Sequence, residues 1–151
     1  MRIKKNDIFL VVFAIFILVV GGLIYIIFRP HYLKMFTWLQ FLNIDTSKLH
    51  LFDTSENIKI LSFCIYSLPN ALWAISAYII FGLILKKDEK LFFIYSIIFT
   101  FINISFELFQ YFKIIPGTFD LIDLAVLLIS FLIGILIYKI IIRRVSDETK
   151  N

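Results

Sequence analysis

Long runs of apolar residues, separated by short polar segments, dominate this chain of 151 residues. The first run, 8–28, contains twenty-one residues and no charge. At about 1.5 Å per residue it is long enough to cross a hydrocarbon core of about 30 Å, and it exceeds the roughly 7–15 residues of a signal-peptide core. Further runs follow at 60–85, 91–112 and 119–142. The pattern predicts four transmembrane helices.

Composition agrees with this interpretation, because hydrophobic residues make up 61% of the chain, against roughly 45–50% in soluble domains. No repeat, low-complexity tract or Gly/Ser linker marks a second domain. Only a few residues around Pro116 and Gly117 join the last two runs, so these must form an antiparallel hairpin. We therefore expect an all-α fold: a four-helix polytopic membrane bundle that forms one integral membrane domain over 1–151.

The basic residues are distributed unevenly about the predicted spans. One side carries ten of them: Arg2, Lys4, Lys5, Lys86, Lys87, Lys90, Lys139, Arg143, Arg144 and Lys150. The other side carries five: Arg29, Lys34, Lys48, Lys59 and Lys113. Cytoplasmic loops are enriched in Lys and Arg, so both termini are predicted to be cytoplasmic. The net charge of +4 is thus explained by membrane topology, and no nucleic-acid partner is predicted.

The outer loop, 29–59, contains an amphipathic segment at 31–44. Its polar residues recur at every third position: Lys34, Thr37, Gln40 and Asn43. On a helix this spacing gives a narrow polar stripe opposite a broad apolar face. The segment is too short to span, so we expect a helix lying at the outer interface, or packed as a lid on the other helices. His31 and His50 fall in the same loop without other ligands at metal-binding spacing, and no metal is predicted.

Polar residues gather near the outer ends of the last two predicted spans. Asn103, Glu107 and Gln110 are separated by four and three residues, so they share one helical face. Asp120 and Asp123 follow in the first turns of the last helix. A carboxylate at membrane depth costs a few kcal/mol, so such residues usually face a polar interior and mark function. Asp120 has a second interpretation, because a carboxylate also stabilises a helix start.

The second predicted span brings further polar groups to the same outer level. Pro69 has no N–H and leaves the carbonyl of Ile65 without its helical partner, next to Asn70. Freed backbone at membrane depth usually lines a cavity. We therefore predict a shared polar cavity near the outer face. Its lining is Asn70, Asn103, Glu107, Gln110, Asp120 and Asp123.

The charge of this predicted cavity leaves two possibilities open. Its three carboxyl groups have no Lys or Arg among them. Either one carboxyl is protonated and available for acid/base chemistry, or a cation compensates the charge: a metal ion, an ammonium group or a partner's Lys or Arg.

These residues resemble the VanZ-like family of small polytopic bacterial membrane proteins. The family pattern has Glu-x-x-Gln, a short turn, Phe-Asp-x-x-Asp and then Asn and two glycines along the last helix. The matching residues are Glu107, Gln110, Phe119, Asp120, Asp123 and Gly134, with Ser130 in place of the first glycine. The chain departs from the pattern at Leu127, where the family has Asn, and at Gly117, where it often has a basic residue. The resemblance implies a multi-pass protein of the bacterial plasma membrane, with a link to the cell envelope and to glycopeptide (teicoplanin) tolerance.

Two functional hypotheses follow. In the first, the protein is not an enzyme, and its acidic cavity binds a cation, an amphiphile or an envelope protein. In the second, it acts on an envelope lipid, with Glu107 or Asp123 as the acid/base group. The sequence contains no HExxH motif, no Walker glycines and no Ser or Cys nucleophile with a histidine in reach, which favours the first hypothesis. It identifies no cofactor.

Overall fold

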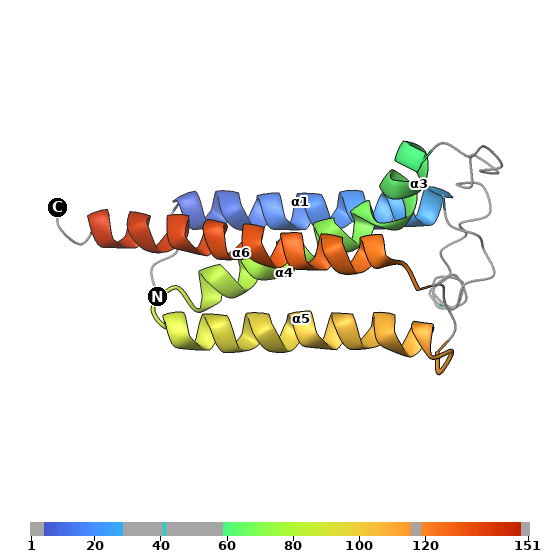
Figure 1. Ribbon diagram of the computed structural model, residues 1–151. Helices are drawn as coiled ribbons and strands as arrows, with labels where there is room; N and C mark the ends of the chain where they lie inside the picture. The colour runs from blue at the N-terminus through green and yellow to red at the C-terminus, as the bar shows by residue number, and fades with distance from the viewer. Residues whose placement is uncertain (1–4, 29–40, 42–58, 116–118, 149–151) are drawn as a thin grey trace.

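The computed structural model describes residues 5–28, 41, 59–115 and 119–148, and every element in this part of the chain is an α-helix. The elements run in the order α1 (Lys5–Phe28), α3 (Lys59–Tyr66), α4 (Leu68–Ile84), α5 (Glu89–Tyr111) and α6 (Leu121–Glu148) (Figure 1). The expected all-α class is confirmed for these residues. The amphipathic segment at 31–44 lies outside them, apart from Phe41.

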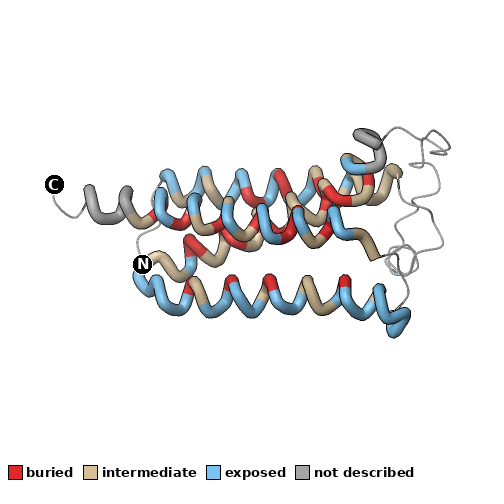
Figure 2. Tube along the Cα trace, viewed as in Figure 1, coloured by how far each residue is buried: buried red, intermediate tan, exposed pale blue. Residues whose placement is uncertain are grey.

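Three helices are long and apolar enough to cross a membrane: Lys5–Phe28, Glu89–Tyr111 and Leu121–Ile142. They correspond to the predicted spans at 8–28, 91–112 and 119–142. Their outward faces are exposed (Figure 2) and carry large apolar side chains that no other described part of the protein covers. Phe101 and Leu132, for example, are 68% and 59% exposed. Lipid is the solvent that suits such a surface.

The second predicted span, 60–85, is not one continuous helix. It is divided at Ser67 into α3, with 8 residues, and α4, with 17. The Ser67 N–H still donates to the Phe63 carbonyl at 3.0 Å, but Pro69 has no N–H to donate to the carbonyl of Ile65. The 17 residues of α4 correspond to about 25 Å, which is less than the about 30 Å of a hydrocarbon core.

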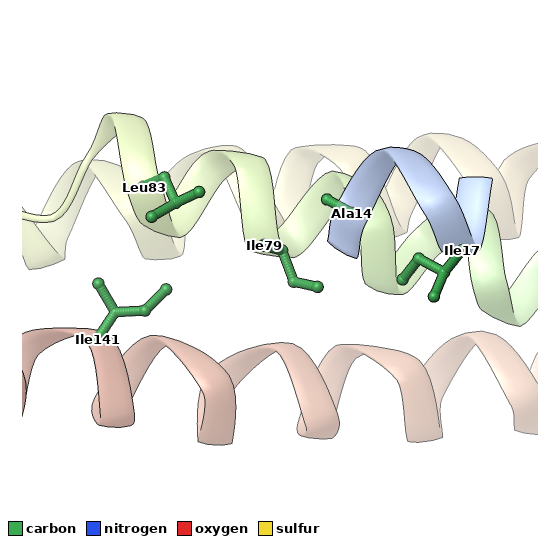
Figure 3. Packing of buried hydrophobic residues seen from close by; sticks show 5 residues of the cluster. All are labelled: Ala14, Ile17, Ile79, Leu83 and Ile141. Atoms are coloured by element: carbon green, nitrogen blue, oxygen red, sulfur yellow. The ribbon is translucent and has the colours of Figure 1, made fainter. Parts of the chain in front are cut away.

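Helix α4 is the centre of the bundle, since it packs extensively against both α1 and α6 (Figure 1). An apolar cluster joins the three helices and contains Ala14 and Ile17 of α1, Ile79 and Leu83 of α4, and Ile141 of α6 (Figure 3). Helix α5 lies against α6 and makes a smaller contact with α4. Helix α4 is therefore tightly packed against α1 and α6, and α5 lies along one side of them.

The start of α1, the α4–α5 turn and the end of α6 lie at one end of the bundle (Figure 1). There, Lys86 Nζ forms a salt bridge with Asp7 Oδ2 at 2.7 Å. Asp88 caps α5 by accepting a hydrogen bond from the Leu91 N–H at 3.0 Å. The end of α5 and the start of α6, with the carboxylates singled out in the sequence, lie at the opposite end.

Candidate functional site

The face of α5 that turns towards the bundle is largely polar. The buried residues of this helix are Phe92, Ser96, Thr100 and Glu107, which recur at multiples of about one helical turn. Asn103 lies in the same stripe and is half-buried. Polar side chains on the inward face of a helix whose other faces are apolar usually mark a functional site. This stripe is therefore the candidate site on α5.

Helix α6 presents a matching stripe of small and polar residues. Asp123, Leu127, Ser130, Gly134 and Tyr138 are all buried and are separated by three or four residues. Asp123 is only 6% exposed and Ser130 only 1%. The two stripes meet where Phe92 stacks on Tyr138, while Leu127 and Gly134 pack against Tyr78 of α4.

Two aromatic contacts determine the register of α5 against α6. The rings of Phe92 and Tyr138 are stacked with centroids 3.7 Å apart, and those of Tyr111 and Phe119 lie 5.1 Å apart at the other end. Fifteen residues after Phe92 is Glu107, and fifteen residues before Tyr138 is Asp123. The second contact gives the same pairing, because Glu107 lies four residues before Tyr111 and Asp123 lies four residues after Phe119. Antiparallel helices with this register have Glu107 and Asp123 at the same level.

The register of α4 against α6 adds the helix interruption to that level. A Cβ at Gly134 would lie 2.6 Å from Cγ of Tyr78, so these two residues are in close contact. Eleven residues before Gly134 is Asp123, and eleven residues before Tyr78 is Ser67, where α4 begins. The two helices run in parallel, so the break between α3 and α4 lies near the level of Asp123. Ser67 itself is 1% exposed.

Hydrogen bonds join α4 to α5 about two turns deeper, and a ring contact with Phe131 adds α6. The Tyr78 hydroxyl lies 2.7 Å from Thr100 Oγ1, and Thr100 Oγ1 lies 2.7 Å from the carbonyl of Ser96. Thr100 has one hydroxyl proton and donates it to that carbonyl, so Tyr78 is the donor to Thr100. The Tyr78 ring is held edge-on by Phe99 and Phe131, with centroids 5.6 and 5.9 Å away. The network holds α5 in place beneath the level of Glu107.

The predicted cavity residues differ in their surroundings. Glu107 and Asp123 are buried, and they lie at one level on neighbouring helices. Asp120 instead accepts a hydrogen bond from the Ile122 N–H at 2.8 Å through Oδ1, and so caps the start of α6. Asn103 donates through Nδ2 to the carbonyl of Phe99 at 2.8 Å, on its own helix.

The remaining predicted residues, Asn70 and Gln110, are half-buried. Asn70 follows Ser67 by about one turn of α4, and Gln110 follows Glu107 by about one turn of α5. The structure thus separates one carboxylate that stabilises a helix start, Asp120, from the two that are enclosed between helices.

Within the described residues, no group of three or more His, Cys, Asp or Glu side chains is arranged to hold a metal ion. The three carboxylates therefore do not form one metal-binding group. His31 and His50 lie outside the described part of the chain.

Sequence reasoning did not identify the hydroxyl groups of Thr100, Ser130 and Tyr78 as part of this polar interior. A signal for the first was present, because Ser96, Thr100, Asn103 and Glu107 recur at a spacing of three or four residues. The sequence around Tyr78 shows no such spacing. A tyrosine among apolar residues is usually predicted to be part of the hydrophobic core.

Comparisons of this chain with protein-family models, with curated proteins and with solved structures find no match. The resemblance to the VanZ-like family therefore rests on the motif residues themselves.

Proposed function

We propose that this chain is a multi-pass membrane protein of the bacterial cell envelope that binds the cationic group of an amphiphile through Glu107 and Asp123. One observation carries the proposal: two carboxylates on neighbouring helices are each more than nine-tenths buried at one level of the bundle. An apolar chain retains such groups at membrane depth mainly where they serve function, because burying them costs a few kcal/mol each.

The proposed membrane architecture has four passes. Helix α4 by itself is short for a bilayer, but α3 and α4 together run from Lys59 to Ile84 and would cross as one interrupted pass. Broken helices at membrane depth occur where the freed backbone is enclosed in protein or lines a polar site. The break at Ser67, near the level of Asp123, supports a site formed by three helices.

The chemistry of the site favours a positively charged group. Carboxylates bind ammonium and guanidinium groups through charge-assisted hydrogen bonds, which are about twice as strong as neutral ones. The carbonyl of Ile65, at the helix break, is left without a helical donor by Pro69 and would be a further acceptor for such a group. An amphiphile could place its apolar part among the exposed apolar side chains of α5, which include Phe106 and Phe109.

The test compares Glu107→Gln and Asp123→Asn with the wild-type protein in a bacterial host exposed to a panel of envelope-acting antibiotics that includes teicoplanin. Both changes keep the shape of the side chain and remove its charge. Each is expected to abolish the tolerance that the wild-type protein confers, with abundance in the membrane fraction measured by immunoblot.

Asp120→Asn is the matched control. It removes a carboxylate three residues from Asp123, but asparagine caps a helix about as well as aspartate, so wild-type behaviour is expected. If Glu107→Gln and Asp123→Asn are as abundant as wild type and confer the same tolerance, the proposal fails.

A further inference from the structure

The end of the bundle opposite the carboxylates has the reverse charge. Four of its lysines are exposed: Lys5 on α1, Lys87 and Lys90 around the α4–α5 turn, and Lys139 on α6. The start of α1, the α4–α5 turn and the end of α6 all lie at this end (Figure 1). Asp7 forms a salt bridge with Lys86 here, and Phe92 stacks on Tyr138.

The acidic residues at this end do not cancel these lysines. Asp7 forms a salt bridge with Lys86, whose side chain is largely buried, and Asp88 caps α5. Glu89 is the third described acid there, against five described lysines. The sequence of α6 then continues with two basic residues, Arg143 and Arg144, and two acidic ones, Asp147 and Glu148.

The other end of the bundle has the opposite balance. Among the residues whose side chains the structure describes, it carries Lys113 against Glu107, Asp120 and Asp123. The charge asymmetry therefore belongs to the folded molecule, since the two ends are formed by residues far apart in the sequence.

The exposed lysines lie where the apolar spans end. Lys87 follows the last residues of α4, and Lys90 immediately precedes Leu91, the first large apolar residue of α5. Lys139 lies about one turn inside the end of the apolar part of α6, and its long side chain can extend its ammonium group to the headgroup level.

We propose that this lysine-rich end binds the headgroups of anionic phospholipids. A lysine near an anionic membrane surface contributes about fivefold to binding. Lys87 and Lys90, on one turn, would together favour an anionic over a zwitterionic lipid by roughly twenty-five-fold. This surface is distinct from the carboxylates of the proposed binding site, so the two proposals succeed or fail independently.

The experiment measures lipid retained by the purified full-length protein, by native mass spectrometry, during titration with phosphatidylglycerol or phosphatidylcholine. Wild type is expected to retain phosphatidylglycerol at least tenfold more tightly. The double variant Lys87→Gln/Lys90→Gln is expected to lose most of that preference, and 0.5 M NaCl is expected to weaken it in wild type, as screening requires. The control, Lys113→Gln, removes an exposed lysine from the other end and is expected to keep the wild-type preference.

Both substituted lysines are exposed and form no side-chain hydrogen bond or salt bridge with another described residue, so circular dichroism is expected to show an unchanged helix content. Equal retention of the two lipids by wild type, or an unchanged preference in the double variant, would refute the proposal. Glycerol 3-phosphate at the same concentration is expected not to displace the lipid. Displacement would instead assign this end to a soluble phosphate compound and would overturn the lipid assignment.

Discussion

Tyr78 and Gly134 show how single residues determine the approach of these helices. Glycine allows the backbone of α6 to lie directly against the tyrosine ring, with no room for a methyl group. The ring then reaches across to α5, where its hydroxyl donates to Thr100. Lipid provides no hydrophobic driving force for helix association, so membrane helices depend on close packing. Small residues at the contact allow their backbones to approach closely. The pair therefore sets the separation of three helices.

Gly134→Ala tests this interpretation. The added methyl would lie 2.6 Å from Cγ of the Tyr78 ring, so we expect a loss of about 1–3 kcal/mol in stability, the usual cost of overpacking a core. Thermal unfolding of the protein in detergent, followed by circular dichroism, measures it. The control is Gly22→Ala, where the new Cβ meets nothing within 4 Å. It is expected to be neutral or stabilising by about 0.5–1 kcal/mol, since alanine favours a helix over glycine. Equal unfolding temperatures for the two variants would contradict the close contact.

Helix α4 connects the elements of the bundle through several polar contacts with α1. The Ser76 hydroxyl donates to the carbonyl of Ala14 at 2.9 Å, and Trp73 Nε1 donates to the carbonyl of Leu18 at 3.2 Å. The salt bridge between Asp7 and Lys86 closes the same helix pair at its end. These three contacts advance along α4 as they retreat along α1, as an antiparallel pair requires. The first helix is thus an integral part of the bundle.

Charge reversal tests this salt bridge at the scale of the helix pair. The side chains of Asp7 and Lys86 are 20% and 10% exposed, so this ion pair is neither fully exposed nor fully buried. Asp7→Lys alone is expected to cost about 1–2 kcal/mol in stability because it places like charges together. Asp7→Lys combined with Lys86→Asp is expected to recover most of the loss in thermal unfolding. If the double variant is no more stable than Asp7→Lys, the salt bridge does not hold these helices together.

At the scale of the whole molecule, the two ends of the bundle differ in charge and in the elements that form them. Lys87 lies at the end where α1 begins, and Lys113 follows α5 at the other. Both side chains are exposed. The excess of Lys and Arg predicts that the first of these ends is cytoplasmic.

Cysteine labelling tests that orientation. Cys64 is the single cysteine of the chain, so a Cys64→Ala background removes the native thiol. On this background, Lys113→Cys is expected to react with a membrane-impermeant maleimide in intact cells. Lys87→Cys is expected to react only after the membrane is permeabilised. The reverse pattern would invert the topology.

Much of the helical architecture could be predicted because it depends on local composition. The apolar runs at 8–28, 91–112 and 119–142 each correspond to one helix, since an apolar segment in lipid must satisfy its backbone internally. The run at 60–85 predicts one span, although Pro69 marks the place where its hydrogen bonding changes. Composition identified the segment as apolar, but it did not show that the helix would be divided at Ser67 into α3 and α4.

The candidate site could also be predicted from the sequence only in part. Spacing alone identified Glu107, Asp120 and Asp123 as polar residues at membrane depth. Spacing could not show that Asp120 caps a helix while the other two carboxylates are buried. Capping requires the backbone N–H of Ile122, two residues away, to point at the Asp120 carboxylate. Spacing also gave no reason to group Tyr78 with Thr100, which are joined only in the folded bundle.

The sequence by itself thus determined the helical class, three helices able to cross a membrane and the uneven distribution of charge, because these follow from the length and polarity of successive segments. Only the tertiary structure decided which residues meet. It brought Glu107 and Asp123 to one level, set the helix break beside them and assigned Asp120 to a cap. The physical reason is register: the side chains that share a level on neighbouring helices depend on how the helices pack, and no single helix contains that information.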